Sequence, residues 1–104
     1  MSSGSGMVPV HPGEILGEEL AERGLSASAL AAALGVPANR VTAILNGQRG
    51  VTADTALRLA RYFGTTPQLW LNLQKTFELR VAETRSGSEI ARQVRPAEPM
   101  QATG

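Results

Sequence analysis

The sequence predicts an all-α domain built from five helices. Apolar residues recur at helical spacing in five successive segments, and no segment shows the strict alternation that indicates a strand. Glycine, proline and cap-forming residues separate these segments at short intervals. With 104 residues, 42% of them hydrophobic and 18% charged, the chain can form one domain around one core.

The first two helices have clear start and stop residues. The first is expected to begin near Pro12, a favoured first-turn residue, and to end at Gly24. Ser26 can cap the second, and Gly35 can end it in the left-handed conformation.

The third and fourth helices follow from the same signals. The third is expected to start at Pro37, to run to Asn46 and to be closed by Gly47. The fourth begins after Thr52 and stops at Gly64.

The fifth helix opens with a cap and a first-turn proline, Thr66 and Pro67, and carries Leu69, Trp70, Leu73 and Phe77 on one side.

Residues 8–83 form the predicted domain, and residues 84–104 form a tail. The tail is either mobile or partly helical, with a short sixth helix from a Ser88 cap to Val94. Residues 1–7 resemble a flexible linker or a remnant of cloning.

Composition excludes several classes of protein. There is no cysteine, so neither a disulfide scaffold nor a thiolate zinc site is expected, and no segment resembles a signal peptide or a membrane span. The single histidine, His11, lies three residues before Glu14 at a helix start, where capping is a better interpretation than catalysis or metal binding. We therefore expect a cytoplasmic protein that is not an enzyme and needs no cofactor.

Charge is unevenly distributed although the net charge is only +1. Residues 10–22 carry four glutamates and no base, whereas residues 23–61 carry five arginines against Asp54 alone. A basic middle segment favours an anionic polymer as partner, and scattered surface charge is the plainer alternative.

The turn between the second and third helices is short enough to bring them into close contact. Only Gly35, Val36 and Pro37 join them, and Ala31 is small where a larger side chain would push the helices apart. Five apolar residues are expected to face inward here: Leu30, Leu34, Val36, Val41 and Ile44. The combined pattern is typical of a helix-turn-helix.

The exposed side of the third helix carries no acid. In a helix-turn-helix this helix lies in the major groove, where arginine can reach guanine or phosphate and asparagine offers an amide to base edges. The candidate DNA-binding residues are Pro37, Ala38, Asn39, Arg40, Thr42, Ala43, Asn46, Gln48 and Arg49. The candidate phosphate contacts are Ser26 and Ser28.

Several of these residues have a plainer interpretation that the sequence leaves open. Asn39 can serve only to start the helix, and Asn46 only to end it. Arg40 can be a solvated side chain, and Gln48 and Arg49 can lie on a loop without touching DNA.

Beyond the helix-turn-helix, the chain resembles a known family over residues 11–79. The stretches that carry the resemblance are "HPGEIL", "ALGVPANRVTAILNGQRGVT" and "ALRLARYFGTTPQLWLNLQKTFEL". They are similar to the HigA/VapI antitoxins of the Xre/Cro/C1 helix-turn-helix proteins. The family's helices form a compact lambda-repressor-like domain.

The resemblance implies a function with two partners. It implies a dimer that binds operator DNA and represses its own operon, and that neutralises a HigB-type mRNA-cutting toxin of the RelE kind. Two departures from the family pattern concern base reading: Ala43 stands where an arginine is common, and Pro37 where Ser or Thr is common. Base readout is therefore expected to depend more on Arg40 and Asn39.

Two other functions remain open. A stand-alone phage-type repressor would share the DNA chemistry and differ only through "HPGE" and "TPQLWLNLQ". The second alternative is a protein-interaction module that no longer binds DNA. It is favoured by Ala38 and Ala43, which lie on the groove side of the third helix.

The contacts with a second copy and with a toxin are assigned to different helices. One helix-turn-helix offers too few contacts for tight specific binding, so we expect a homodimer. Its candidate interface residues are Trp70, Leu71, Leu73 and Phe77, unless all four belong to the core. The candidate toxin contacts are Glu14, Glu18 and Glu22, because a ribonuclease presents a cationic surface. The competing interpretations are that these acids only solvate the helix, or that the tail binds the toxin.

Overall fold

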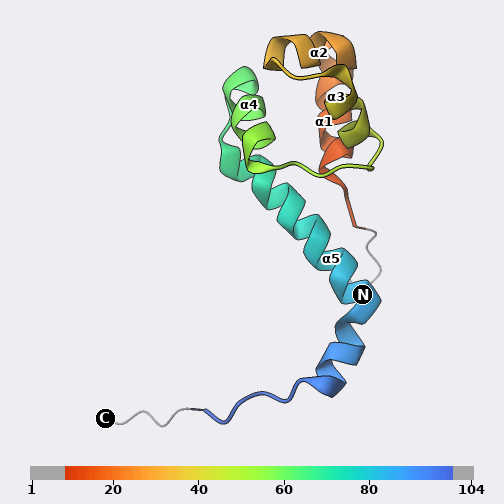
Figure 1. The fold of residues 1–104 in the computed structure, drawn as a ribbon, viewed down its shortest axis with the longest axis vertical. Coiled ribbons are helices and arrows are strands. Elements are labelled where there is room, and N and C mark those ends of the chain that lie inside the picture. Colours follow the sequence, from red (N-terminus) through yellow and green to blue (C-terminus); the bar gives the residue numbers. More distant parts are fainter. Residues whose placement is uncertain (1–8, 100–104) are drawn as a thin grey trace, which may run out of the picture.

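The computed structural model describes residues 9–99, and within them it contains five helices and no strand (Figure 1). The helices are α1 (Pro12–Arg23), α2 (Ala27–Leu34), α3 (Ala38–Leu45), α4 (Ala53–Phe63) and α5 (Pro67–Gln93). The all-α prediction is confirmed. The predicted linker at 1–7, with Val8, and the end of the predicted tail at 100–104 lie outside the described residues.

Local side-chain caps set most of the helix starts. The hydroxyl oxygen of Ser26 accepts a hydrogen bond from the backbone N–H of Ala29, and Thr52 and Thr66 cap α4 and α5 in the same way. Each of these caps satisfies a backbone donor that has no partner inside the helix. The predicted starts and stops of the first four helices agree with the structure to within a residue or two.

The core lies between the first four helices and the first half of α5. Its buried apolar residues are Leu16, Leu20, Leu30, Ala31, Leu34, Val41, Ile44, Val51, Ala56, Leu59, Ala60 and Trp70. Each fully buried leucine or isoleucine contributes about 1.5–3 kcal/mol relative to an exposed one. Ile15, on the same helix as Leu16 and Leu20, is only half-buried.

The predicted sixth helix is wrong, because α5 continues without a break through Ser88 to Gln93. A separate helix would have to be nucleated anew, whereas extending an existing helix adds one hydrogen bond for each residue ordered. Gly87 costs about 1 kcal/mol inside a helix, and no proline interrupts the segment. Ser88 is therefore an interior residue of α5 and not a cap.

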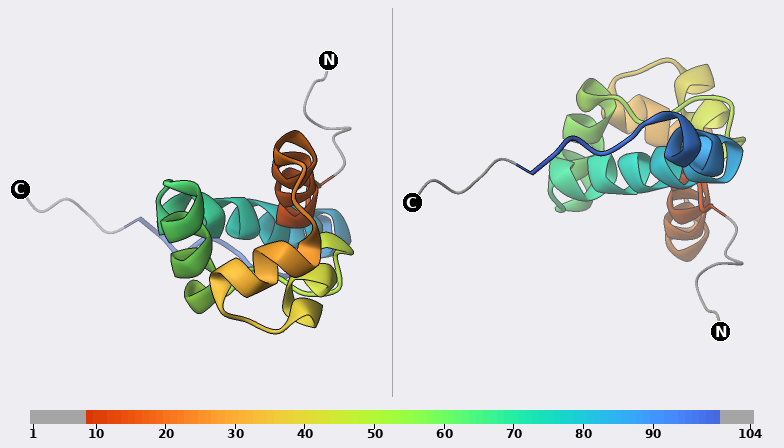
Figure 2. Two further views of the ribbon diagram at one scale, coloured as in Figure 1. Left: turned by 90° about the horizontal axis from the view of Figure 1, so that it is seen from above. Right: turned by 90° about the horizontal axis from the view of Figure 1, so that it is seen from below.

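Helix α5 lies beneath the other four helices and extends well beyond them. It packs on α4 and α1, and Figure 2 shows it crossing under the body in the view from below. Its second half projects past the core (Figure 1). No helix among the described residues is long and apolar enough to cross a membrane.

Candidate nucleic-acid interface

A tight turn sets the position of α3 against α2. Gly35 has φ +72°, and the N–H groups of Gly35 and Val36 donate to carbonyls in the last turn of α2. That left-handed conformation suits glycine. Ala31 is buried at the contact between the two helices, together with Val41 and Ile44 of α3. The predicted helix-turn-helix is therefore present.

The start of α1 supports α3 from the other side. Nδ1 of His11 accepts a hydrogen bond from the Gly13 N–H at 2.8 Å, so His11 caps α1. Its ring also packs edge to face on Phe77, with centroids 4.8 Å apart. A Cβ on Gly13 would overlap the carbonyl group of Ile44, so the α1 and α3 backbones meet directly. The "HPGE" stretch thus caps α1, as predicted, and it also packs against α5 and α3.

One side of α3 is open to solvent and free of carboxylates. Its exposed residues are Pro37, Ala38, Asn39, Thr42 and Asn46, with Ala43 half-buried among them. We call these six residues the reading face. The Thr42 hydroxyl lies 3.3 Å from the Asn39 carbonyl and 3.4 Å from that of Ala38, so its proton is engaged and its methyl and lone pairs remain available. Asn46 is also the C-cap residue of α3, so it ends the helix, as one of its two interpretations from the sequence predicted.

Arg40 does not belong to the reading face. Its Nη1 donates to Oδ2 of Asp54 at 3.0 Å, and its side chain is only 25% exposed. Its Nε is buried and has no hydrogen-bond partner among the described residues. This ion pair holds the guanidinium against the start of α4, so the contact of Arg40 with a guanine or a phosphate stays a prediction that would require Arg40 to leave Asp54.

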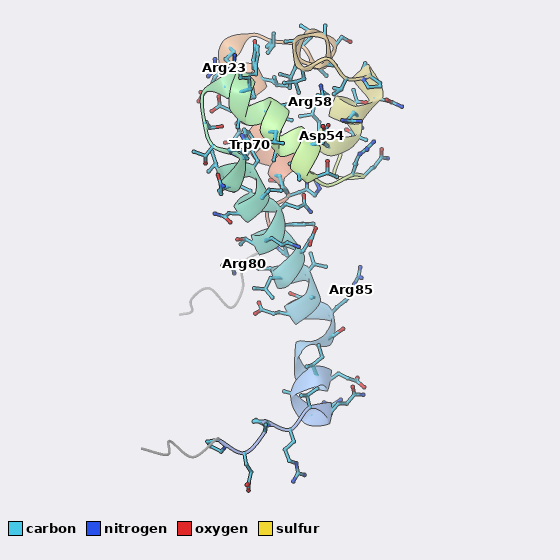
Figure 3. The ribbon with its side chains drawn as sticks, turned by 60° about the vertical axis from the view of Figure 1, so that its left-hand side comes forward. Arg23, Asp54, Arg58, Trp70, Arg80 and Arg85 are labelled. Atoms are coloured by element: carbon cyan, nitrogen blue, oxygen red, sulfur yellow. The ribbon has the colours of Figure 1, made fainter. Side chains whose placement is uncertain are left out.

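Asp54 is the centre of a network that joins three helices, and the sequence did not predict this network. The same Oδ2 accepts a hydrogen bond from Nε of Arg58 at 2.9 Å, and Nη1 of Arg58 donates to the Leu34 carbonyl at the end of α2 at 2.8 Å. Figure 3 shows Asp54 and Arg58 side by side on α4. The hydrogen bond from Arg58 holds the pKa of Asp54 below its ordinary value, burial opposes this, and Arg40 adds to the lowering. The four-residue spacing of Asp54 and Arg58 in the sequence indicates the ion pair between these two residues, but not the contacts with Arg40 and Leu34.

The loop after α3 places two more candidate residues beside the reading face. The N–H groups of Gln48 and Arg49 donate to the Ala43 carbonyl at 2.9 and 3.2 Å, so the loop folds back on the end of α3. Gly47 permits this turn with φ +75°. Gln48 and Arg49 are both exposed. The structure therefore brings the predicted loop residues next to the predicted helix residues.

The two candidate serines lie at the start of α2. The Ser26 hydroxyl oxygen is used in capping, at 3.0 Å from the Ala29 N–H, and Ser28 is exposed in the first turn. Both lie where the N-terminal end of a helix favours an anion. Among residues 9–99, no three or more histidine, aspartate or glutamate side chains are grouped so that they could hold a metal ion.

Known proteins share this arrangement. A model of the helix-turn-helix family matches residues 16–70. Virulence-associated protein I of Dichelobacter nodosus is 58% identical over 78 residues, which are 74% of this chain and 72% of that protein. This chain belongs to the HigA/VapI family of helix-turn-helix proteins.

Two solved structures of HigA-type proteins superpose well on this member of the family. An addiction module antidote protein of the HigA family from Coxiella burnetii is 56% identical, with a TM-score of 0.85. Antitoxin HigA from Pseudomonas aeruginosa, solved with the higBA promoter, is 46% identical with the same TM-score. Each alignment covers 88% of this chain and the whole of the other.

Of the four predicted dimer residues of this HigA-type chain, one is a core residue and three are half-buried. Trp70 is 2% exposed, and its Nε1 donates to the Thr65 hydroxyl at 2.9 Å, so the expectation that it lies on a dimer surface is corrected. Leu71, Leu73 and Phe77 are half-buried. Leu69, expected on their side of the helix, is 44% exposed. The large apolar side chains that α5 exposes are Leu69, Leu79 and Ile90, and Val94 follows the helix.

The predicted toxin contacts lie on α1, a different helix from the one that carries the reading face. Glu14, Glu18 and Glu22 are exposed on α1, and Glu19 is paired with Arg23 at 3.2 Å. Helix α1 contacts α3 through the buried residues at its start. A toxin bound to these acids would thus contact α1, whereas a DNA duplex would contact α3.

Proposed function

We propose that this chain is the antitoxin of a type II toxin–antitoxin module. It binds an inverted repeat in operator DNA as a homodimer, represses its own operon and neutralises an mRNA-cutting toxin of the HigB/RelE kind. We further propose that it acts in the cytoplasm, where both partners occur. Half-sites are expected about one helical turn, roughly 10 bp, apart.

The observation that carries the DNA-binding part is the reading face with its adjoining loop. Asn39, Thr42 and Asn46 offer short polar groups without a carboxylate, and Arg49 lies beside them on a loop folded against α3. Asparagine can make two hydrogen bonds to adenine, and a threonine methyl can contact thymine. The promoter-bound state of the related Pseudomonas aeruginosa protein supports this use of the fold.

The DNA-binding part is tested by selecting duplexes from a random-sequence library with the wild-type chain. The expected result is an enriched inverted repeat, bound as two chains per duplex in sedimentation. A triple variant Asn39→Ala/Thr42→Ala/Asn46→Ala should enrich no sequence while keeping its helical circular dichroism. Failure of the wild type to enrich any sequence would leave the protein-interaction module as the better function.

The toxin-neutralising part of the proposed function is tested by co-expressing the chain with a HigB-type toxin encoded beside its gene and measuring growth. Wild type should restore growth and co-purify with the toxin. The Glu18→Lys/Glu22→Lys variant should lose both, because charge complementarity speeds encounter and selects the partner. A chain truncated after Glu83 tests the competing docking element. Rescue by both variants would exclude both surfaces.

A stand-alone repressor is the second candidate function, favoured by one observation. The "HPGE" and "TPQLWLNLQ" stretches both have packing roles: His11 caps α1, and Trp70 fills the core. Their presence therefore does not require a toxin. If wild type binds its operator but fails to rescue growth, the repressor is the function.

A further inference from the structure

Gln74 is a buried polar side chain on α5. It is 8% exposed, and with Trp70 it is one of two buried residues of that helix. A buried amide is costly unless both of its ends find partners. The partners of Gln74 lie on two different segments.

Each end of the Gln74 amide has one partner. Its Oε1 accepts a hydrogen bond from the backbone N–H of Val51 at 2.8 Å, and its Nε2 donates to Oε2 of Glu78 at 2.8 Å. The amide has only one orientation that suits both, since the Val51 N–H can only donate and an ionised Glu78 can only accept. Glu78 therefore directs the amide oxygen of Gln74 toward the loop between α3 and α4.

Gly50 makes room for this amide. A Cβ on Gly50 would lie 2.7 Å from Nε2 of Gln74 and 2.8 Å from its Cδ and Oε1. Gly50 does not have a positive φ, so a side chain at this position would conflict with the Gln74 amide and not with the backbone conformation. The amide thus lies directly on the backbone of the loop.

The loop is held at both of its ends. At one end the Gln48 and Arg49 N–H groups donate to the Ala43 carbonyl of α3, and at the other the Val51 N–H donates to Gln74 of α5. The exposed side chains of Gln48 and Arg49 lie between these two anchors. Their position relative to the reading face is therefore set jointly by α3 and α5.

We propose that Gln74 is a positioning residue of the DNA interface, which acts by placing Arg49 on a phosphate of the duplex. The proposal rests on the proposed DNA-binding function. It assigns a role in that interface to a side chain on the helix most distant from the reading face in sequence. Gln74 itself is buried and does not touch DNA.

The experiment is a double-mutant cycle on the salt dependence of DNA binding. The probe is the duplex that wild type enriches from the random library, titrated at several salt concentrations. In wild type, Arg49→Ala should lower the slope of log affinity against log salt by about 1, the loss of one phosphate contact. In a Gln74→Met background, Arg49→Ala should leave the slope unchanged, because Arg49 is no longer held on the phosphate.

Three further variants separate positioning from a loss of folding. Gly50→Ala displaces the amide without altering α5 and should also remove the effect of Arg49→Ala. The exchange Gln74→Glu/Glu78→Gln keeps an acceptor for Val51 and a donor between the two side chains, so it should restore the wild-type slope. Arg85→Ala is the matched control, since Arg85 is exposed on the projecting half of α5 (Figure 3), and should leave the slope unchanged.

The outcomes distinguish this proposal from the proposed function. An equal effect of Arg49→Ala in the wild-type and Gln74→Met backgrounds would overturn the role of Gln74 while leaving DNA binding intact. The same conclusion follows if Arg49→Ala has no effect in wild type. If Gln74→Met does not fold, the slopes measured for Gly50→Ala and for the exchange variant decide whether Gln74 positions Arg49. Absence of any wild-type binding would overturn the proposed function itself.

Discussion

Nη1 of Arg40 lies 3.0 Å from Oδ2 of Asp54, and this ion pair ties the first turn of α3 to the first turn of α4. The same carboxylate oxygen is bonded to Arg58, which in turn bonds the last turn of α2. The arginine that the sequence offered as a base reader is thus engaged with α4 and ties α3 to it.

Arg40→Ala should weaken binding to the selected duplex without confining the loss of preference to one base pair, because the Arg40–Asp54 ion pair holds the helix that carries the whole reading face. A base-reading arginine would instead relax preference at one base pair by about 1–3 kcal/mol. The measurement is competition binding with a set of single-base variants of the selected duplex. A loss of preference confined to one guanine position would mean that Arg40 leaves Asp54 and reads that base.

Asp54→Asn should raise the affinity for random duplex and steepen its salt dependence. The substitution removes a carboxylate beside the reading face and releases two guanidinium groups that can displace counterions from phosphates. Gel shifts at several salt concentrations measure the slope. Glu89→Gln on the far half of α5 is the control, and the idea fails if both variants change the slope alike.

The Asp54 network should weaken at acid pH. Its hydrogen bond from Arg58 lowers the pKa of Asp54 in the folded chain below the value of 3.8 that an ordinary aspartate has. As pH falls the unfolded chain binds the proton first, so this stabilisation is complete above that ordinary pKa and is lost as pH falls through the folded-state pKa. The free energies of unfolding in urea of wild type and Asp54→Asn should therefore converge as pH falls below about 4. A difference that is constant from pH 7 to the acid limit would contradict it.

Gly13→Ala should destabilise the fold by about 1–3 kcal/mol, a cost typical of overpacking. The added methyl would overlap the Ile44 carbonyl, and a backbone group cannot move aside as a side-chain tip can. Gly17→Ala is the matched control on the same helix, because its Cβ would meet only Leu45 Cδ2 at 3.8 Å. It should stabilise by about 0.5–1 kcal/mol. Equal changes in the urea midpoint would show that α1 and α3 are not in backbone contact.

Asn39→Ala should reduce discrimination at one base pair by about 1–3 kcal/mol and leave binding to random duplex nearly unchanged. Asn39 is exposed in the first turn of α3, on the reading face. Asn72→Ala changes the same residue type at an exposed position of α5 and should have no effect on either quantity. If Asn39→Ala changes only stability, Asn39 serves to start the helix and does not read bases.

The sequence by itself determined the first four helices, the start of the fifth and the turn that joins α2 to α3. Caps such as Ser26 and Thr66 bond N–H groups three residues away, and Gly24 and Gly35 end helices through their own backbone conformation. These interactions are local, so their residue types can be recognised in the chain. The acid-free side of α3 was visible for the same reason, because helical period alone separates it from the buried side.

Only the tertiary structure decided which polar side chains are open to solvent beside α3 and which are bonded to a neighbouring helix or loop. Arg40 meets Asp54 across 14 residues of sequence, Gln74 meets Val51 across 23, and Gly13 meets Ile44 across a longer interval still. Trp70 likewise became a core residue once α4 and α5 packed together. Such pairings depend on how helices pack, and the residue types involved are equally common on solvated surfaces. The physical reason is that periodicity and capping report on the nearest turn of helix, whereas the partner of a long side chain is set by the neighbouring element.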